Sequence, residues 1–445
     1  MNKNLIISIM IILINILAAP YCYSQYTIEQ ITNEIFRFGE EPQISDNGYI
    51  LWRGTDETNT IDSILLYDGN SIQRIGDGVR HHLSSTGFAV WESDGEIILY
   101  DGSSTLQLGV GWDAQVNSNG HVTWLGSSNS VYLYDGSAIN IISANSRWNQ
   151  RLQLNDNDYV VWDGEADTEI FLYNGSTVIQ LTDNATSDRA PKINNNGDVA
   201  WQAYDGSSYQ VLLYNGASTT QLTNNIYNNV FDEDNLQITD SGYLVWASKT
   251  GSDISDFEIF LYNGSSTIQL TDNSYYDGNP RINDNGHVVW VGFKDGDDEI
   301  FFFDGYAITQ LTNNTYPDLN PRINSSGDIV WNSQIITQID PHNYEFKYDV
   351  FHATPSVVPG PVRINASPLV YYTSLMVAYD QSMSGDSIQS QSLVFNEDLY
   401  IDENKSVTLV GGYDHDYTNI DGKTILNGSM IINNGIVVIE NYSLE

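Results

Sequence analysis

Cysteine is nearly absent from this chain: Cys22 is the single one among 445 residues. One cysteine cannot form an internal disulfide, and it cannot build the multi-thiolate site that structural zinc requires. We therefore expect the fold to be stabilised by packing, without a covalent or metal cross-link of this kind.

Basic residues are scarce as well. The chain has 17 Lys and Arg residues against 57 Asp and Glu residues, so its formal net charge is −40 at pH 7. A surface of this sign repels the phosphates of nucleic acid and anionic lipid, and it attracts divalent cations or basic partners. We therefore expect no nucleic-acid partner, and a protein that is kept soluble outside the cytoplasm.

Long apolar runs are confined to the N-terminus, where Leu5 to Ala19 is almost unbroken apolar sequence after Lys3. The run is short for a transmembrane helix, and small side chains at Cys22 and Ser24 suit cleavage of a leader. Residues 1–24 are thus predicted to be the signal peptide of a secreted or periplasmic protein without a transmembrane segment. A lipid anchor on Cys22 is disfavoured because the residues just before it are not small.

A helical period of comparable length is missing between residues 26 and 350, and a repeated phrase stands there instead. The phrase approximates P-x-I-N-D-N-G-x-V-V-W. Its tryptophans are Trp52, Trp91, Trp124, Trp162, Trp201, Trp246, Trp290 and Trp331. Their spacing of 33 to 45 residues is typical of a four-stranded propeller blade.

Two further phrases complete the repeat. Ile170 to Gly175 reads I-F-L-Y-N-G, and Gln180 to Asn184 reads Q-L-T-D-N. The β-branched and aromatic residues of V-V-W and I-F-L-Y favour buried strands, while the D-N-G and Y-N-G segments favour hairpin turns. Each repeat is therefore predicted to form four antiparallel strands, and the repeats together an all-β propeller.

The ends of the repeat region indicate how the ring closes. Residues 27–33 resemble the outer strand of a repeat but have no blade before them. The eighth repeat has its first two strands, Pro321 to Trp331, but no L-Y-N-G phrase. We therefore expect the N-terminal strand to complete the last blade of a propeller over residues 25–350. Eight blades are predicted, and seven are the alternative if the degenerate copy lies outside the ring.

The order P-x-I-S-D-N-G-x-x-x-W, E-I-F-L-Y and Q-L-T resembles the TolB-type β-propeller repeat of bacterial envelope proteins, over about residues 27–340. The resemblance implies a propeller whose mouth binds a partner protein or peptide. This chain has Asn where the family turn, Ser-Pro-Asp-Gly, has Pro, and nothing in it matches the separate N-terminal domain of TolB itself.

Composition changes after residue 350. Residues 351–369 are expected to be a linker, because proline repeatedly interrupts regular hydrogen bonding there. The prolines are Pro355, Pro359, Pro361 and Pro368. One amphipathic helix is expected next, capped by Thr373 and stopped by Gly385. The residues of its apolar face are Leu375, Ala378, Tyr379 and Met383.

Short apolar strands separated by Gly and Asn follow this helix within residues 370–445. They are expected at residues 392–395, 406–410, 429–432 and 436–439. The order of a helix and then short stacked strands resembles the start of a right-handed parallel β-helix module, in which a helix caps the first coil. The resemblance implies a small accessory domain and association with a surface or a carbohydrate.

No catalytic motif is recognisable, so the sequence predicts a protein that is not an enzyme. His121 and His287 follow hairpin glycines and are expected to be exposed strand residues, and His81-His82 is expected to lie in a blade loop. The seven histidines show no regular metal-ligand spacing. No cofactor is predicted apart from weak Ca²⁺ candidates in one Gly-containing acidic loop, for which a solvated hairpin tip is the alternative. These candidates are Asp295, Asp297 and Asp298.

Some aromatic residues are not explained by the repeat. They lie in connections between the outer strand of one blade and the inner strand of the next: Trp112, Trp148, Tyr227, Tyr275, Tyr276 and Tyr316. Such connections crowd one face of a propeller around its channel, where aromatic side chains suit peptide or sugar contacts. Capping of blade edges is the alternative. Acidic residues that are expected either to ring the same mouth or to form turns are Asp188, Asp277 and Asp318.

These patterns favour a monomeric, non-enzymatic binding protein, secreted or periplasmic, that engages a protein or peptide at the propeller mouth. The alternative is a cell-surface protein that binds or processes glycans, with the C-terminal segment assisting adhesion. A purely structural surface protein is a third hypothesis.

Overall fold

The computed structural model divides the chain into two compact units, a propeller unit of Tyr26–Ser356 and a C-terminal unit after it. Among the described residues, no helix has the length and apolar composition needed to cross a membrane. The described residues are 25–32, 40–54, 62–144, 150–164, 168–224, 235–253, 257–305, 307–340, 343–356, 361–365, 370–372, 374–414 and 417–444.

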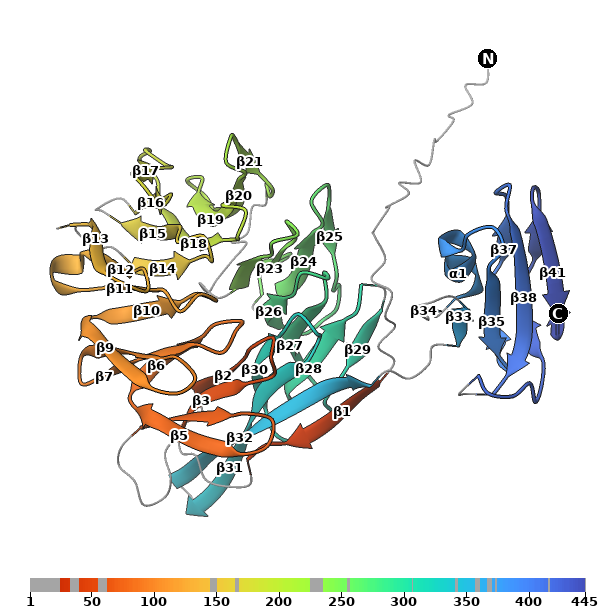
Figure 1. The fold of residues 1–445 in the computed structure, drawn as a ribbon, viewed down its shortest axis with the longest axis horizontal. Coiled ribbons are helices and arrows are strands. Elements are labelled where there is room, and N and C mark those ends of the chain that lie inside the picture. The colour runs from red at the N-terminus through yellow and green to blue at the C-terminus, as the bar shows by residue number, and fades with distance from the viewer. Residues whose placement is uncertain are drawn as a thin grey trace. The chain divides into compact units, whose positions relative to one another are not determined.

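Eight four-stranded antiparallel sheets form a ring (Figure 1). The protein is therefore an all-β, eight-bladed β-propeller, as predicted, and the seven-bladed alternative is excluded. The first blade consists of β2 (Glu40–Ile44), β3 (Ile50–Gly54), β4 (Ser63–Tyr67) and β5 (Ile72–Asp77), and the second of β6 (Val79–Leu83), β7 (Ala89–Ser93), β8 (Glu96–Tyr100) and β9 (Thr105–Val110). The third consists of β10 (Trp112–Val116), β11 (Val122–Leu125), β12 (Val131–Tyr134) and β13 (Ile139–Ser143). A short 3-10 helix, η1 (Ser127–Asn129), lies between β11 and β12.

The next four blades have the same consecutive order. The fourth blade consists of β14 (Gln150–Leu154), β15 (Val160–Gly164), β16 (Glu169–Tyr173) and β17 (Val178–Gln180), and the fifth of β18 (Asp188–Ile193), β19 (Val199–Tyr204), β20 (Tyr209–Tyr214) and β21 (Thr219–Gln221). The sixth consists of β22 (Leu236–Ile238), β23 (Leu244–Lys249), β24 (Phe257–Tyr262) and β25 (Thr267–Gln269). The seventh consists of β26 (Asp277–Ile282), β27 (Val288–Lys294), β28 (Asp297–Phe303) and β29 (Ile308–Gln310).

The repeat tryptophans form the scaffold of the blades, as the sequence predicted. All eight are among the largest fully buried side chains. Trp162, for example, stacks on Phe171 of the neighbouring strand with ring centroids 5.8 Å apart. Val245 of the sixth blade packs in one cluster with Trp290 of the seventh. Because neighbouring blades pack face to face in this way, their middle strands are apolar on both sides, and polar residues do not alternate along them.

The N-terminal strand closes the ring. β1 (Gln25–Gln30) pairs with β32 (Asn343–Ser356) at the outer edge of the eighth blade, whose order is β1-β32-β31-β30. The backbone N–H of Ile31 donates to the carbonyl of Val350 at 2.8 Å, and the Tyr26 hydroxyl donates to the carbonyl of Gly327 at 3.0 Å. The prediction that the N-terminus completes the last blade is confirmed.

The third strand of the eighth blade has a sequence unlike the other repeats. β30 (Asp318–Ile323) is followed by β31 (Ile329–Asp340), a strand of 12 residues, and by β32, a strand of 14 residues. The two long strands pair antiparallel along most of their length. β32 replaces the missing L-Y-N-G phrase, and it carries the propeller past residue 350, to Ser356.

The C-terminal unit begins with two antiparallel strands and one helix. α1 (Leu375–Gln381) follows β33 (Val362–Ile364), which lies within the segment expected to be a linker, and β34 (Val370–Tyr372). The helix cap is Ser374, whose side chain accepts from the Val377 backbone N–H at 3.3 Å. The expected cap, Thr373, lies outside the described residues.

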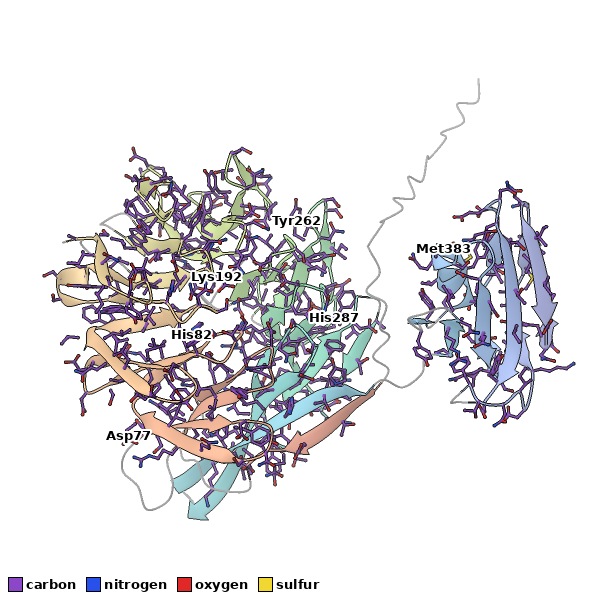
Figure 2. The ribbon with its side chains drawn as sticks, viewed as in Figure 1. Asp77, His82, Lys192, Tyr262, His287 and Met383 are labelled. Carbon is purple, nitrogen blue, oxygen red and sulfur yellow. The ribbon has the colours of Figure 1, made fainter. Side chains whose placement is uncertain are left out.

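The expected apolar face of the helix is confirmed at three positions and wrong at the fourth. Leu375, Ala378 and Tyr379 are fully buried in the core of this unit. Met383, labelled in Figure 2, lies beyond the end of α1 and is 73% exposed. The helix stops at Gln381, so its period does not reach Met383.

Parallel pairing organises the rest of the C-terminal unit. Its strands stack in three rows, β35-β38-β41, β36-β39-β42 and β37-β40. The strand bounds are β35 Ser387–Gln391, β36 Val394–Phe395, β37 Leu399–Ile401, β38 Ser406–Tyr413, β39 Thr424–Leu426, β40 Met430–Ile432, β41 Ile436–Glu440 and β42 Tyr442–Leu444.

Candidate functional site

The first strands of the blades line a channel through the propeller. Neighbouring first strands contact each other around the ring. Three adjoining cavities of about 350, 300 and 210 Å³ are lined by these strands and by the hairpins that follow them. Ile44 and Ile323 line both larger cavities, and His82 and Leu83 line both the largest and the smallest. The cavities are therefore sections of one channel, with a volume suited to a small ligand or a short chain segment.

Eight side chains at one repeat position form a ring in this channel, which we name the polar ring. Each is long and polar, and each precedes the apolar residue of the P-x-I-N phrase. Its members are Gln43, His82, Gln115, Gln153, Lys192, Gln237, Arg281 and Arg322. His82 and Lys192 lie toward the middle of the propeller (Figure 2).

The sequence interpretation missed the polar ring, although a signal for it was present. Every member lies nine residues before its repeat tryptophan. The strand period of two then places all eight side chains on the same side of their strands, and the closed ring turns that side toward the channel.

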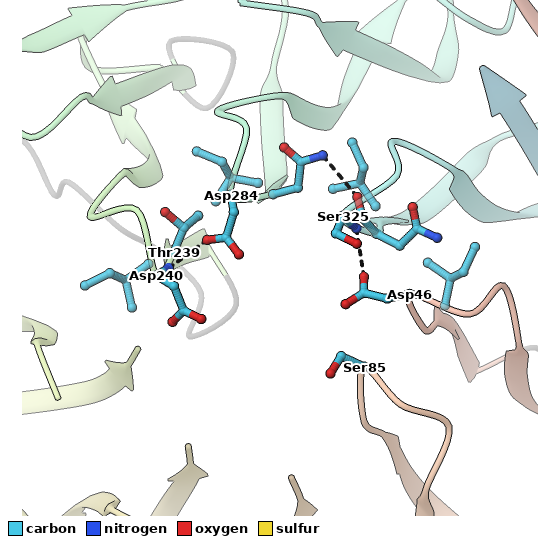
Figure 3. Close-up of a pocket in the computed structure, with 12 residues that line it drawn as sticks. Asp46, Ser85, Thr239, Asp240, Asp284 and Ser325 are labelled. Atoms are coloured by element: carbon cyan, nitrogen blue, oxygen red, sulfur yellow. Dashed lines mark hydrogen bonds between the residues drawn. The ribbon is translucent and has the colours of Figure 1, made fainter. Parts of the chain in front are cut away.

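The hairpins at one end of the channel form an acidic rim. Its carboxylates are Asp46, Asp156, Asp240 and Asp284, which line the two smaller cavities. Figure 3 shows Asp46, Asp240 and Asp284 at the cavity of about 300 Å³. The carboxylate of Asp284 accepts from the backbone N–H of Asp240 at 2.8 Å, and that of Asp46 accepts from Ser325 at 2.8 Å. Each rim carboxylate follows its polar-ring residue by three positions in the chain, in the hairpin after the first strand.

Asparagine side chains connect the blades just inside the rim. The Nδ2 of Asn155 donates to the carbonyl of Asn194 at 2.9 Å, and that of Asn194 donates to the carbonyl of Thr239 at 3.0 Å. These residues belong to the I-N-D-N-G phrase, and all three are buried. The phrase therefore makes turns and also cross-links adjacent blades, which holds the channel wall in one geometry.

The cations of the polar ring stand out against the acidity of the chain. Lys192, Arg281 and Arg322 line the largest of the three cavities, and among the described residues that line it Glu41 is the only one with a carboxylate. Arg322 forms an ion pair with Glu41, and Arg281 is buried and donates to the carbonyl of Pro280 at 2.9 Å. The ratio of acidic to basic side chains that holds for the whole chain is thus reversed in this cavity.

Two histidines are part of the same wall, which corrects the expectation of a blade loop. His81 and His82 lie in β6, not in a connection. The Nδ1 of His82 accepts from the backbone N–H of Val116 at 3.2 Å, and Gln43 donates to the carbonyl of His81 at 3.0 Å. Burial lowers the pKa of each histidine to about 4. Both are therefore neutral at pH 7.

His287 and His121 are both less exposed than expected. His287 is 1% exposed and packs edge-on against Phe302 at 5.8 Å, so the expectation of an exposed position is wrong. Burial lowers its pKa to about 4. His121 is partly buried, and its Nδ1 lies 2.7 Å from the Asp158 carboxylate. His287 is thus covered by the third strand of its own blade, whereas His121 contacts the hairpin of the next blade.

The aromatic residues predicted from the inter-blade connections do not form one site. Trp112 begins β10 and is 37% exposed, and Tyr316 is 44% exposed. Tyr275 stacks on Phe301 at 6.2 Å, and Tyr276 meets the edge of Phe257 at 5.6 Å, so these two cap blade edges. None of these four lines the three cavities. The other two candidates, Trp148 and Tyr227, lie outside the described residues.

The acidic residues predicted near the mouth have a structural position instead. They are Asp188, Asp277 and Asp318, and all three are buried. Asp277 accepts from the Trp290 indole at 2.9 Å and from the Asn273 amide at 2.6 Å. Asp188 and Asp318 accept equivalent bonds from Trp201 and Trp331. The expectation that these carboxylates face the mouth is corrected, because each is directed into its blade to satisfy a buried N–H.

The weak calcium candidates lie at one hairpin of the seventh blade. Asp295 occupies the turn between β27 and β28 with a φ of 57°, and Asp297 and Asp298 begin β28. In the described part of the chain, no group of three acidic, histidine or cysteine residues is placed to hold a metal ion. The Ca²⁺ hypothesis gains no support from this geometry.

No protein-family model and no curated protein matches this sequence. Solved structures with similar folds include the propeller domain of the trilobed protease from Pyrococcus furiosus, with 12% identity and a TM-score of 0.47 over 63% of this chain and 100% of that one. A second is the acylaminoacyl peptidase of Pyrococcus horikoshii, with 11% identity and a TM-score of 0.46 over 67% of this chain and 57% of that one. A third is a putative TolB from Agrobacterium tumefaciens, with 14% identity and a TM-score of 0.31 over 49% of this chain and 87% of that one.

These likenesses concern the fold. They agree with the propeller that the repeats predicted, and they include a TolB propeller as the resemblance implied. They also correct the expectation that the chain is not an enzyme. Two of the similar structures come from peptidases. The chain spans about 57% of the length of one of them, the acylaminoacyl peptidase.

Proposed function

We propose that this chain is a binding protein of the cell envelope or extracellular space, and that its propeller channel takes up a segment of a protein or peptide partner. The observation that carries the proposal is the polar ring, eight hydrogen-bonding side chains at one level of the channel. Four of them are glutamines, whose amides both donate and accept. A peptide backbone offers the complementary alternation of N–H and C=O groups.

The rigidity of the wall supports uptake of a partner. The channel is built from strands and is cross-linked between blades by Asn155, Asn194 and Asn324. A site held in its binding geometry loses little conformational entropy when the ligand arrives. The apolar residues just inside the polar ring, such as Ile44 and Ile323, provide surface for the side chains of such a segment.

The location and the C-terminal unit belong to the same proposal. An extracytoplasmic location rests on the predicted leader, on the single cysteine and on the excess of acidic over basic residues. We propose that the C-terminal unit is the start of a parallel β-helix module. Its three rows of parallel strands and the helix α1 beside the first of them support this.

Site-specific photocrosslinking in the native envelope fraction tests the proposed function. A photoreactive amino acid replaces Gln115 or Gln237 in the polar ring, and Leu106, 47% exposed on the outer strand β9, in the control. We expect both ring positions to capture the same polypeptide and the outer position not to capture it. Capture of that polypeptide from Leu106 with equal yield, or from neither ring position, would overturn the proposal.

A further inference from the structure

We infer that the polar ring binds a carboxylate, and that the segment entering the channel presents this group. The inference rests on the proposed function, because it names the chemistry of what the channel takes up. Its basis is the position of Lys192, Arg281 and Arg322 around one cavity of about 350 Å³.

The charge of the cavity is opposite to that of the rest of the molecule. Acidic residues outnumber basic ones 57 to 17 in the chain, yet three cationic residues and one carboxylate, Glu41, line this cavity. Arg281 is only 7% exposed and lies with Lys192 and Arg322 on the wall of this cavity, so an anionic group that enters it meets three positive charges.

The donors in the cavity suit a carboxylate in particular. An arginine guanidinium presents parallel N–H groups that match the two oxygens of a carboxylate, and a lysine adds a mobile point charge. The glutamines at the neighbouring ring positions supply uncharged N–H donors at the same level.

A buried imidazole on the cavity wall has one hydrogen-bonding position open to the contents of the channel. His81 lies on the cavity wall, is 8% exposed, and its Nε2 lies 3.1 Å from the carbonyl of Glu41. Its other ring nitrogen, Nδ1, is buried and has no hydrogen-bond partner among the described residues. Because a carbonyl only accepts, Nε2 carries the proton and Nδ1 of this neutral ring is an acceptor. It can therefore accept from a water or from an N–H of the entering segment, whereas the carboxylate itself is bound by the cationic side chains.

The two ends of the channel give the ligand a direction. The acidic rim of Asp46, Asp156, Asp240 and Asp284 repels a carboxylate at the hairpin end. In each first strand the polar ring precedes the rim, so it is nearer the end where the inter-blade connections lie. The carboxylate therefore enters from the connection end and stops at the polar ring.

Binding of two acids and of their neutral counterparts to the full chain tests the inference. One pair of probes is N-acetyl-diglycine as the free acid and as the amide, and the other is glucuronate and glucose. We expect a free acid to bind at low ionic strength with one site per chain, and its neutral counterpart to bind about tenfold more weakly or not at all. The acid that binds better distinguishes a peptide carboxylate from a sugar carboxylate.

Substitution by glutamine is the matched change, because four blades already carry glutamine at this position. We expect K192Q together with R281Q to weaken binding of the acid about tenfold or more, and K192Q alone to weaken it less. R74Q is the control, because Arg74 is exposed on the outer strand β5 and its substitution also removes one positive charge. The thermal melting curve of each variant shows whether it is folded, and K192Q alone still tests the site if the double variant is not.

The outcomes separate the inference from the proposed function. Equal binding of acid and neutral probes, or equal weakening by R74Q and K192Q, overturns the carboxylate site. If photocrosslinking from Gln115 and Gln237 succeeds while the acids fail, the channel binds a partner through other chemistry. If the acids bind while crosslinking captures no polypeptide, the site takes a small acid and the proposed function falls.

Discussion

The side-chain amide of Asn324, in the eighth blade, donates a hydrogen bond of 3.1 Å to the backbone carbonyl of Ser45 in the first. The two residues are 279 positions apart in the chain. The same kind of bond joins Asn155 to the carbonyl of Asn194, within the ring. One residue of the repeat phrase thus links neighbouring blades within the ring. It also links the eighth blade to the first, at the junction that we call the seam.

Replacing Asn324 with alanine is expected to destabilise the propeller by about 1–3 kcal/mol. It removes the buried bond to Ser45 between the eighth and first blades and the bond that the Asn324 side chain accepts from the Asp328 N–H. Urea unfolding followed by tryptophan fluorescence measures the loss. The control is N285A, which removes an exposed amide that donates to Ser325 at 3.0 Å and is expected to cost less. An equal loss of unfolding free energy in the two variants would show that the buried Asn324 bond contributes no more than the exposed one.

The seam also depends on the backbone of the N-terminal strand. Replacing Ile31 with proline removes the N–H that donates to Val350 at 2.8 Å and is expected to cost about 1–3 kcal/mol beyond the loss in I31A. The alanine variant loses packing but keeps the donor, so the difference between the two midpoints in urea reports the bond. Identical midpoints would mean that β1 contributes nothing to closure through this bond.

Asp277 gives the stability of the propeller a pH dependence. Burial raises its pKa to about 6, against about 3.9 in an unfolded chain. The folded state therefore binds more protons between these values, and the free energy of unfolding falls as the pH rises from about 4 to about 6. In D277N this contribution of about 1–3 kcal/mol is expected to disappear. Melting temperatures of both proteins across this range test it, and parallel curves would contradict it.

His82 gives the free energy of unfolding the opposite pH dependence. Its pKa falls to about 4, first through burial and then through the positive charges of His81, Arg322 and Lys192. Because the unfolded value is about 6.5, the free energy of unfolding falls as the pH decreases from about 6.5 to about 4. We expect H82Q to flatten this slope in urea titrations at pH 7 and pH 5. The residual slope combines His81 and His287, whose pKa values are also about 4, with the opposite contribution of Asp277.

Much of the fold follows from local sequence. The repeat tryptophans, the hairpin turns and the eight-fold count depend on residues close together in the chain, and all are confirmed. The N-terminal strand was predictable because residues 27–33 repeat the pattern of an outer strand. The third strand of the eighth blade, β32, was not predictable because it lacks the L-Y-N-G phrase. Its place in the blade comes from its long antiparallel pairing with β31.

The candidate site was predicted poorly, for a physical reason. Asp277 lies 13 residues before Trp290, and Asp188 and Asp318 have the same spacing from their tryptophans. That regular spacing favours a structural hydrogen bond to the tryptophan. However, whether the carboxylate faces the channel mouth or the inside of its blade depends on the direction of the side chain, which the spacing does not give. His287 shows the same difficulty, because its burial comes from packing against Phe302 of another strand.

The sequence by itself determined the blade, its length and the number of copies, because strand and turn formation depend on nearby residues. Only the tertiary structure decided what the channel contains. Gln43, Lys192 and Arg322 are far apart in the chain, and they form one ring because closure of the propeller brings the first strands together. A charge that is scarce along the sequence is thereby concentrated in one cavity.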